Sequence, residues 1–164
     1  MNRRLMILLC VVLALTLAGT AFSQTRLTFK GTNYASSDLK ALPVDKDHIV
    51  LVGEQLGVEM NDKAPFNNMS THFSMIVFFN KDTGWHFHGY GVYADKDGDT
   101  MMWEIWDSPS GADGGKGKLI GATGKFAGMD GTCDFANEHP RGWPESTGRL
   151  VCHETWNLTL KNPL

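Results

Sequence analysis

One hairpin signal, between residues 85 and 107, constrains the fold of this chain more than any other feature. Two runs rich in aromatic and β-branched residues, 85–94 and 100–106, flank the pair Asp97-Gly98. Asp-Gly between alternating apolar runs is the strongest short-range indication of a β-hairpin, because both residues tolerate the positive φ angles of a two-residue turn. The segment therefore predicts two antiparallel strands. It also gathers histidines, tryptophans and carboxylates in one small region.

Strand patterns recur along the rest of the chain, and helix patterns are nearly absent. The segment 48–60 predicts a long strand that is interrupted or bulged near Gly53 and Gly57. Together with the two hairpin arms there are about eight expected strands, as is typical of a β-sandwich or a β-barrel. The remaining expected strands are residues 26–30, 72–79, 117–120, 132–135 and 149–160.

The first 23 residues have the pattern of a secretory signal peptide. Two arginines precede an apolar run at residues 5–17, and Ala21 and Ser23 are small residues at the positions that a signal peptidase reads. We expect cleavage before Gln24 and a secreted or periplasmic protein whose single domain is residues 24–164. The apolar run is short for a membrane span, so no stable span is expected after cleavage, and an uncleaved anchor is the alternative.

Charge argues against one class of partner, and cysteine content predicts a disulfide. The formal net charge is −3 and no basic residues cluster, which argues against a nucleic-acid partner. Cys10 leaves with the signal peptide, and Cys133 and Cys152 remain. Two cysteines in an exported protein most simply form one disulfide, with two free thiols as the alternative.

The segment Gly121-Ala-Thr-Gly-Lys-Phe-Ala-Gly-Met-Asp-Gly131 spaces four glycines around a single aromatic residue. Glycine is this frequent where the backbone turns with positive φ or passes close to another segment. The segment resembles the Gly-Thr-Gly-Lys-Phe-x-Gly signature of the allene oxide cyclase and dirigent barrel group, and is most similar to its bacterial members of mostly unassigned function. His88-Gly-Tyr90 leading into residues 95–99 is similar to the central hairpin of that group. The resemblance covers residues 70–160.

This resemblance implies an all-β fold, a single eight-stranded antiparallel barrel related to the calycins, with a mostly apolar interior. In the characterised plant members the cavity binds a reactive hydrophobic molecule and steers its cyclisation or coupling. The resemblance thus implies a small hydrophobic molecule as the partner and is compatible with a homo-oligomer. We expect no cofactor. Since fold does not supply chemistry, the site has to be argued from its residues.

The turn of the central hairpin decides which side chains share a face. If Asp97-Gly98 is a two-residue turn, His88 lies opposite Asp107. The face that contains both is rich in apolar residues and is expected to line the barrel interior. His88 beside Asp107 would then be an oriented imidazole that acts as a general base or acid. A slip of one residue would instead place the histidines on a solvated face.

The last expected strand provides a further catalytic candidate, Glu154. It belongs to an alternating apolar series with Cys152 and Trp156. Burial among such side chains raises the pKa of a carboxyl group, and carboxyl groups of this kind concentrate at functional sites. The alternative is a structural carboxylate paired with an arginine or a backbone amide.

Aromatic and histidine side chains are the candidates for ligand contacts. Five tryptophans suit an aromatic or apolar ligand, or they close the barrel ends. His86 and His88 point the same way on a strand and could bind a metal ion. Two ligands do not make a site, and a third would have to come from His72, His153 or a carboxylate, so we expect no metal site. The expected ligand-binding residues are His72, His86, Tyr90, Trp103, Trp143 and Trp156.

Three functions are consistent with these observations. The first is an exported barrel enzyme that isomerises, cyclises or cleaves a small hydrophobic or aromatic molecule, with Glu154, His88 and Asp107 transferring protons. The second is a non-catalytic periplasmic binding protein for a hydrophobic ligand. The third is a structural or interaction protein with a filled barrel. A carboxylate and a histidine converging in a cavity would favour the enzyme, and a purely apolar cavity would favour the binding protein.

Overall fold

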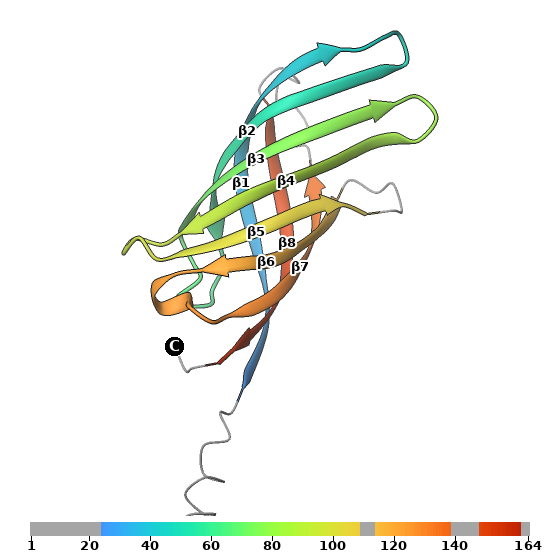
Figure 1. Ribbon diagram of the computed structural model, residues 1–164. Helices are drawn as coiled ribbons and strands as arrows, with labels where there is room; N and C mark the ends of the chain where they lie inside the picture. The colour runs from blue at the N-terminus through green and yellow to red at the C-terminus, as the bar shows by residue number, and fades with distance from the viewer. Residues whose placement is uncertain (1–23, 109–113, 139–147, 162–164) are drawn as a thin grey trace, which may run out of the picture.

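The computed structural model describes residues 24–108, 114–138 and 148–161 (Figure 1). The expected signal peptide at residues 1–23 and the ligand-binding candidate Trp143 lie outside the described residues. Within the described residues, no helix has the length and apolar character needed to span a membrane.

The described chain forms a closed β-barrel with one short 3-10 helix. Each strand pairs antiparallel with the next, and β8 pairs with β1, so the sheet has no free edge strand (Figure 1). This confirms the eight-stranded antiparallel barrel. The elements in chain order are β1 (Thr25–Pro43), β2 (His48–Met60), β3 (Met69–Asn80), β4 (Gly84–Ala94), β5 (Thr100–Asp107), β6 (Gly114–Ala122), η1 (Gly124–Phe126), β7 (Asp130–Glu138) and β8 (Arg149–Leu160).

Alternation along each strand decides which side chains face the interior. On β8 it follows the expectation, since Cys152, Glu154 and Trp156 are all buried. On β2 the usual pattern is inverted, because Gln55 and Glu59 are buried while apolar side chains are exposed on the outer face. Those exposed side chains are Val52, Leu56, Val58 and Met60.

The bulges expected near Gly53 and Gly57 do not occur in β2, which pairs with both neighbouring strands without a register shift. Gly53 serves a close backbone approach instead: a Cβ atom there would lie 1.9 Å from the carbonyl oxygen of Asp38 on β1. The β1 strand also continues past residue 30, where the alternation predicted its end, because β2 pairs with it as far as Pro43.

The register of the β4–β5 hairpin differs by one residue from the expected one. His88 pairs with Trp106 rather than with Asp107. Because of this shift, His86, His88 and Tyr90 lie on the outer face of β4. Their predicted position in the interior is therefore wrong. On β5 the predicted face is correct, since Trp103 is buried and lines the interior together with Asp107.

The side chain of Asp95 explains this register. Its carboxylate accepts the backbone N–H groups of Asp97 and Asp99 at 2.9 and 3.0 Å. Gly98 has a φ angle of +86°, and its N–H donates to the Asp95 carbonyl oxygen at 3.1 Å. These features match a three-residue hairpin loop that ends in a left-handed glycine, rather than the two-residue turn.

One end of the barrel is closed by aromatic packing. Phe66, from the β2–β3 connection, is fully buried, and its ring centroid lies 5.0 Å from that of Phe29 and 5.6 Å from that of Phe126 in η1. Trp156 also stacks on Phe29, at a centroid distance of 5.6 Å, and lies 6.5 Å from Phe66. Because this end is packed solid, the free interior volume lies toward the opposite end.

Candidate functional site

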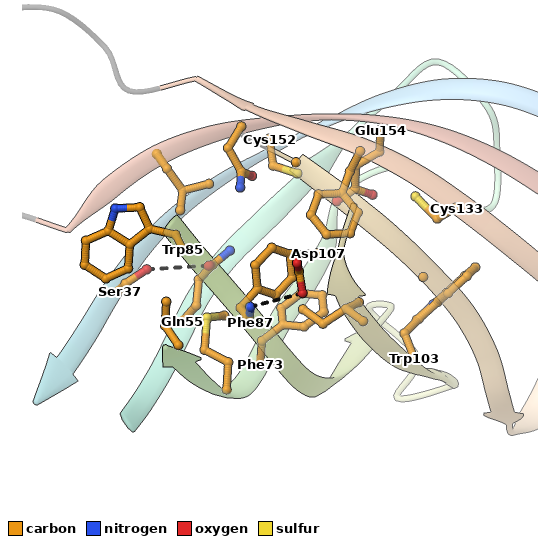
Figure 2. A pocket seen from close by; sticks show the side chains of 18 of the residues that line it. Ser37, Gln55, Phe73, Trp85, Phe87, Trp103, Asp107, Cys133, Cys152 and Glu154 are labelled. Carbon is orange, nitrogen blue, oxygen red and sulfur yellow. Dashed lines mark hydrogen bonds between the residues drawn. The ribbon is translucent and has the colours of Figure 1, made fainter. Parts of the chain in front are cut away.

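A cavity of about 810 Å³ lies inside the barrel, toward the end opposite the packed ring of Phe66 (Figure 2). It extends from Glu154 and Trp156 to Thr83 and Trp85 at the β3–β4 turn, where Trp85 is 54% exposed. This volume is typical of small-molecule sites. All eight strands border the cavity, and β6 does so through Gly114 and Gly117. The walls are mostly aromatic and aliphatic side chains from the other seven strands, among them Leu39, Leu51, Phe73, Met75, Phe87, Ile105, Phe135 and Leu150.

Glu154 supplies the carboxyl group at the inner part of the cavity. The Tyr93 hydroxyl donates to its Oε1 at 2.7 Å, and the Trp156 indole N–H donates to its Oε2 at 2.7 Å. Burial raises the pKa of Glu154 to about 7, and the hydrogen bonds with Tyr93, Trp156 and Cys152 oppose that rise. The carboxyl group is therefore fixed in orientation and able to gain or lose a proton near neutral pH. The position that the sequence predicted for Glu154 is confirmed, and its catalytic role stays a prediction.

Glu59 on β2 is a second buried carboxyl group, which the sequence analysis did not single out. Its side chain is fully buried, Asn61 donates to Oε1 at 3.2 Å, and Oε2 has no hydrogen-bond partner. It lies over Gly31, which pairs with Glu154, and a Cβ atom at Gly31 would stand 1.7 Å from Glu59 Oε1. Burial, and then the charge of Glu154, raise the pKa of Glu59 to about 8.

The sequence holds a signal for Glu59, although hydrophobicity hides it. On β2 the alternation groups Glu59 with Gln55 and with two glycines, and it places the apolar residues on the other face. A rule that turns the apolar face inward therefore assigns Glu59 to solvent. The glycine opposite Glu154 in β1 is the more useful clue, because it makes room for a neighbouring side chain.

Asp107 also lines the cavity, away from Glu154 and toward the open end of the barrel. Its carboxylate accepts the backbone N–H of Phe87 at 3.3 Å (Figure 2) and lies 2.9 Å from Nδ1 of His86. The histidine that accompanies Asp107 is therefore His86 and not His88 as expected. His86 is not part of the cavity lining, so the structure brings no histidine beside Glu154 among the described residues.

The other histidine and tyrosine candidates lie on the outside of the barrel. His88 is half exposed and lies 2.9 Å from Glu104, and His72 is half exposed and lies 3.3 Å from Glu54. Tyr90 is 52% exposed. None of the three lines the cavity, because the hairpin register and the β3 alternation turn them outward, so their predicted position inside it is wrong. Among the described residues, no three His, Cys, Asp or Glu side chains form a group that could hold a metal ion.

Trp103 and Trp156 both line the cavity, as predicted. Their rings meet edge to face at a centroid distance of 5.1 Å, and the Tyr93 ring meets Trp156 in the same way at 4.8 Å. Such pairs stabilise beyond the area they bury. The three rings therefore form a rigid aromatic wall around the Glu154 carboxyl group.

Cys133 and Cys152 line the cavity as free thiols. The register excludes the expected disulfide between them: Cys133 pairs with Trp156, whereas Cys152 pairs with Asn137. That offset separates them by roughly 13 Å along the strands, and a disulfide needs Cα atoms within about 7 Å. Burial raises the pKa of both thiols well above the usual range, so they are protonated and unreactive as nucleophiles.

Comparison with known proteins identifies the fold but no family. No known family profile and no curated protein sequence matches the chain. Two similar solved structures are those of pterocarpan synthase dirigent proteins. The GePTS1 structure has a TM-score of 0.53 at 9% identity over 87% of this chain and 94% of that chain. The PsPTS1 structure has a TM-score of 0.50 at 11% identity over 83% of this chain and 95% of that chain. The chain therefore has a dirigent-like barrel, and at these identities the similarity extends to the fold alone.

Proposed function

We propose that the barrel binds a small hydrophobic molecule in its cavity and that Glu154 exchanges a proton with that molecule. The reaction would be an isomerisation, a cyclisation or a related bond cleavage that needs no cofactor. The observation that carries the proposal is the carboxyl group of Glu154, buried in an apolar cavity and held by Tyr93 and Trp156 at 2.7 Å each.

The chemistry follows from the state of this carboxyl group. A pKa of about 7 leaves both the acid and its conjugate base populated at neutral pH, which suits a general acid-base group. In an isomerisation Glu154 would donate its proton at one atom of the substrate and recover a proton from another, so that no oxidant or reductant is consumed. The aromatic walls would hold the substrate in one conformation during this exchange.

A non-catalytic binding protein is the second candidate, and the same cavity contains an observation that favours it. Both oxygens of Glu154 already accept a hydrogen bond, and the other carboxylate of the cavity, Asp107, is fixed to Phe87 and His86. A structural role for a filled barrel has less support, because the barrel encloses a cavity of ligand size.

Two experiments distinguish these candidates. Native mass spectrometry of protein purified from its own host would identify a co-purifying small molecule. That molecule is then incubated with the wild type, with Glu154→Gln and with His88→Ala, and its conversion is followed by liquid chromatography and mass spectrometry. His88→Ala is the control, because His88 faces outward and pairs with Glu104.

For an enzyme, we expect Glu154→Gln to retain binding and to lose conversion by about 100-fold or more, with His88→Ala unchanged. Binding without conversion by any of the three proteins would establish the binding protein instead. Equal conversion by the wild type and Glu154→Gln would remove Glu154 from the mechanism.

We also propose that the protein is exported, on the basis of the signal-peptide pattern in residues 1–23. The expected product in the native host begins at Gln24 and is found outside the cytoplasm. N-terminal sequencing of each cell fraction tests this, and a product that retains Met1 in the cytoplasmic fraction would contradict it.

A further inference from the structure

Among the described residues, none of the ionisable side chains that line the interior of this barrel is basic. Glu59, Glu154 and Asp107 are buried or line the cavity, and the described cavity lining contains no lysine, arginine or histidine. The two thiols of the lining are protonated, as argued above. The inner surface thus has acidic groups and no basic group among the described residues; the basic partner of Asp107, His86, lies outside the lining.

Strand alternation accounts for this separation of charge. Every lysine and arginine that the structure describes is exposed. On β6, for example, Lys116 and Lys118 are exposed while Gly117 and Leu119 between and beyond them are buried. Lys116 pairs with Asp134 at 3.0 Å on the outer surface, so its charge is already engaged there.

From this separation we propose that the cavity accepts uncharged or cationic apolar molecules and excludes anionic ones such as carboxylates and phosphates. The inference rests on the proposed function, since it assigns the substrate class of the same cavity. It is independent of whether Glu154 performs catalysis.

The physical argument is the cost of an unpaired charge. An anionic head group placed beside Glu154 would lose its hydration in a site where the facing ionisable groups are Glu59, Tyr93, Cys133 and Cys152, none of which is basic. Placed toward the mouth, it would meet the Asp107 carboxylate, whose one histidine partner, His86, lies outside the lining.

Uncharged and cationic head groups meet no such obstacle. A hydroxyl group can donate to either carboxylate, because each carboxylate oxygen accepts more than one hydrogen bond. An ammonium group can pair with the Glu154 carboxylate and also face the ring wall of Tyr93, Trp103 and Trp156, which favours cations.

A matched set of ligands tests the proposal on the full chain after removal of any co-purified molecule. The neutral fluorescent probe N-phenyl-1-naphthylamine reports on cavity occupancy. Dodecan-1-ol, dodecyltrimethylammonium and dodecanoate then compete with it at pH 8. The alcohol is kept below its solubility limit, and the two ionic competitors are kept below their critical micelle concentrations. The three competitors share one chain length and differ in head-group charge.

We expect dodecanoate to compete at least about tenfold more weakly than dodecan-1-ol, and the ammonium to compete at least as well as the alcohol. Dodecanoate binding as tightly as the alcohol would overturn the charge selectivity. Failure of the fluorescent probe and of every competitor to bind would instead overturn the proposed ligand-binding function itself. The two failures are therefore distinguishable.

Variants that replace one carboxylate by an uncharged amide test which residues cause the discrimination against dodecanoate. Glu154→Gln and Asp107→Asn each remove one carboxylate from the cavity, and at least one of them should reduce the discrimination against dodecanoate about threefold or more. Glu104→Gln removes the same charge from the outer face, where Glu104 lies beside His88, and should leave the discrimination unchanged. An equal effect of Glu104→Gln would attribute the selectivity to net charge and overturn the proposal.

Discussion

Glu59 and Glu154 are the two residues at which this barrel departs most from an apolar interior. Each is removed from water, and no basic side chain among the described residues compensates either of them. A buried carboxyl group without a cation is more stable protonated than ionised, and two neighbouring carboxyl groups strengthen that preference. Their protonation should therefore be visible in the stability of the whole protein.

Stability should fall as the pH rises from 5 to 8. The unfolded chain loses these protons near the ordinary pKa of 4.5, whereas the folded protein retains them up to about 7 at Glu154 and about 8 at Glu59. Between those limits the folded state binds more protons than the unfolded state, so the free energy of unfolding decreases with pH. The advantage is complete below about pH 4.5 and is lost as the pH passes through 7 to 8.

The measurement is urea unfolding of the wild type and of Glu59→Gln at pH 5, 6, 7 and 8. Glu59→Gln should flatten the decline by up to about 1.4 kcal/mol per pH unit, the limit for one proton. Glu138→Gln, which removes an exposed carboxylate near His153, is the control and should leave the Glu59 contribution in place. A wild-type stability that rises steadily from pH 5 to 8 would contradict the prediction.

Among the elements, the β4–β5 hairpin shows how one side chain can set the faces of a strand. The Asp95 carboxylate binds two backbone N–H groups of the loop, and it also pairs with Lys125 of η1. Lys125 contacts Asp97 at 2.8 Å as well, and both contacts raise the pKa of Lys125 while that of Asp97 falls to about 2. Lys125 thus links the loop to the glycine-rich segment around η1, beside the hydrogen bonds that join Thr100 to Thr123.

Replacement of Asp95 by Ala should lower the free energy of unfolding by about 1–2 kcal/mol, because two loop N–H groups lose their acceptor. Asp95→Asn should recover part of that loss, since the amide oxygen can still accept both bonds. Lys96→Ala is the matched control on the same loop. The Lys96 ammonium is largely exposed and forms an ion pair with Asp97, so its loss should cost less than about 0.5 kcal/mol. Equal costs for Asp95→Ala and Lys96→Ala, measured by urea unfolding, would show that the loop hydrogen bonds do not hold the turn.

A comparison of β8 with this hairpin shows which site positions the sequence could predict and which it could not. The alternation of β8 placed Glu154 and Trp156 correctly because apolar residues mark its inner face without ambiguity. On β4 both faces contain large side chains, so the face depended on the turn, and Asp-Gly suits both a two-residue and a three-residue loop. The choice between them depended on the Asp95 side chain and its contact with η1, which a local pattern does not contain.

At the scale of the molecule, the barrel divides into a packed end and a hollow end. Closure of the sheet was predictable from the number of strands and from the resemblance to known barrels. The position of the cavity was not, because it depends on Phe66 and Phe126, which come from connections rather than from strands. Those two rings occupy the end that the strand pattern alone would leave open.

This division predicts that the same substitution, Phe to Ala, costs more stability at the packed end than at the hollow end. Phe66→Ala removes a fully buried ring that contacts Phe29 and Phe126, and the void it leaves should lower the free energy of unfolding by about 3–5 kcal/mol. Phe87→Ala removes a ring that borders the existing cavity and contacts Phe135, so we expect a cost of roughly 1–2 kcal/mol.

Binding of N-phenyl-1-naphthylamine should respond in the reverse order. Phe87→Ala changes a wall of the cavity and should alter the affinity for the probe severalfold, whereas Phe66→Ala, measured at a temperature where it stays folded, should leave the affinity nearly unchanged. Urea unfolding and probe titration of the two variants test both halves of the prediction. Equal stability losses at the two positions would mean that the hollow end is packed as tightly as the closed one, and the cavity would then not be a preformed ligand site.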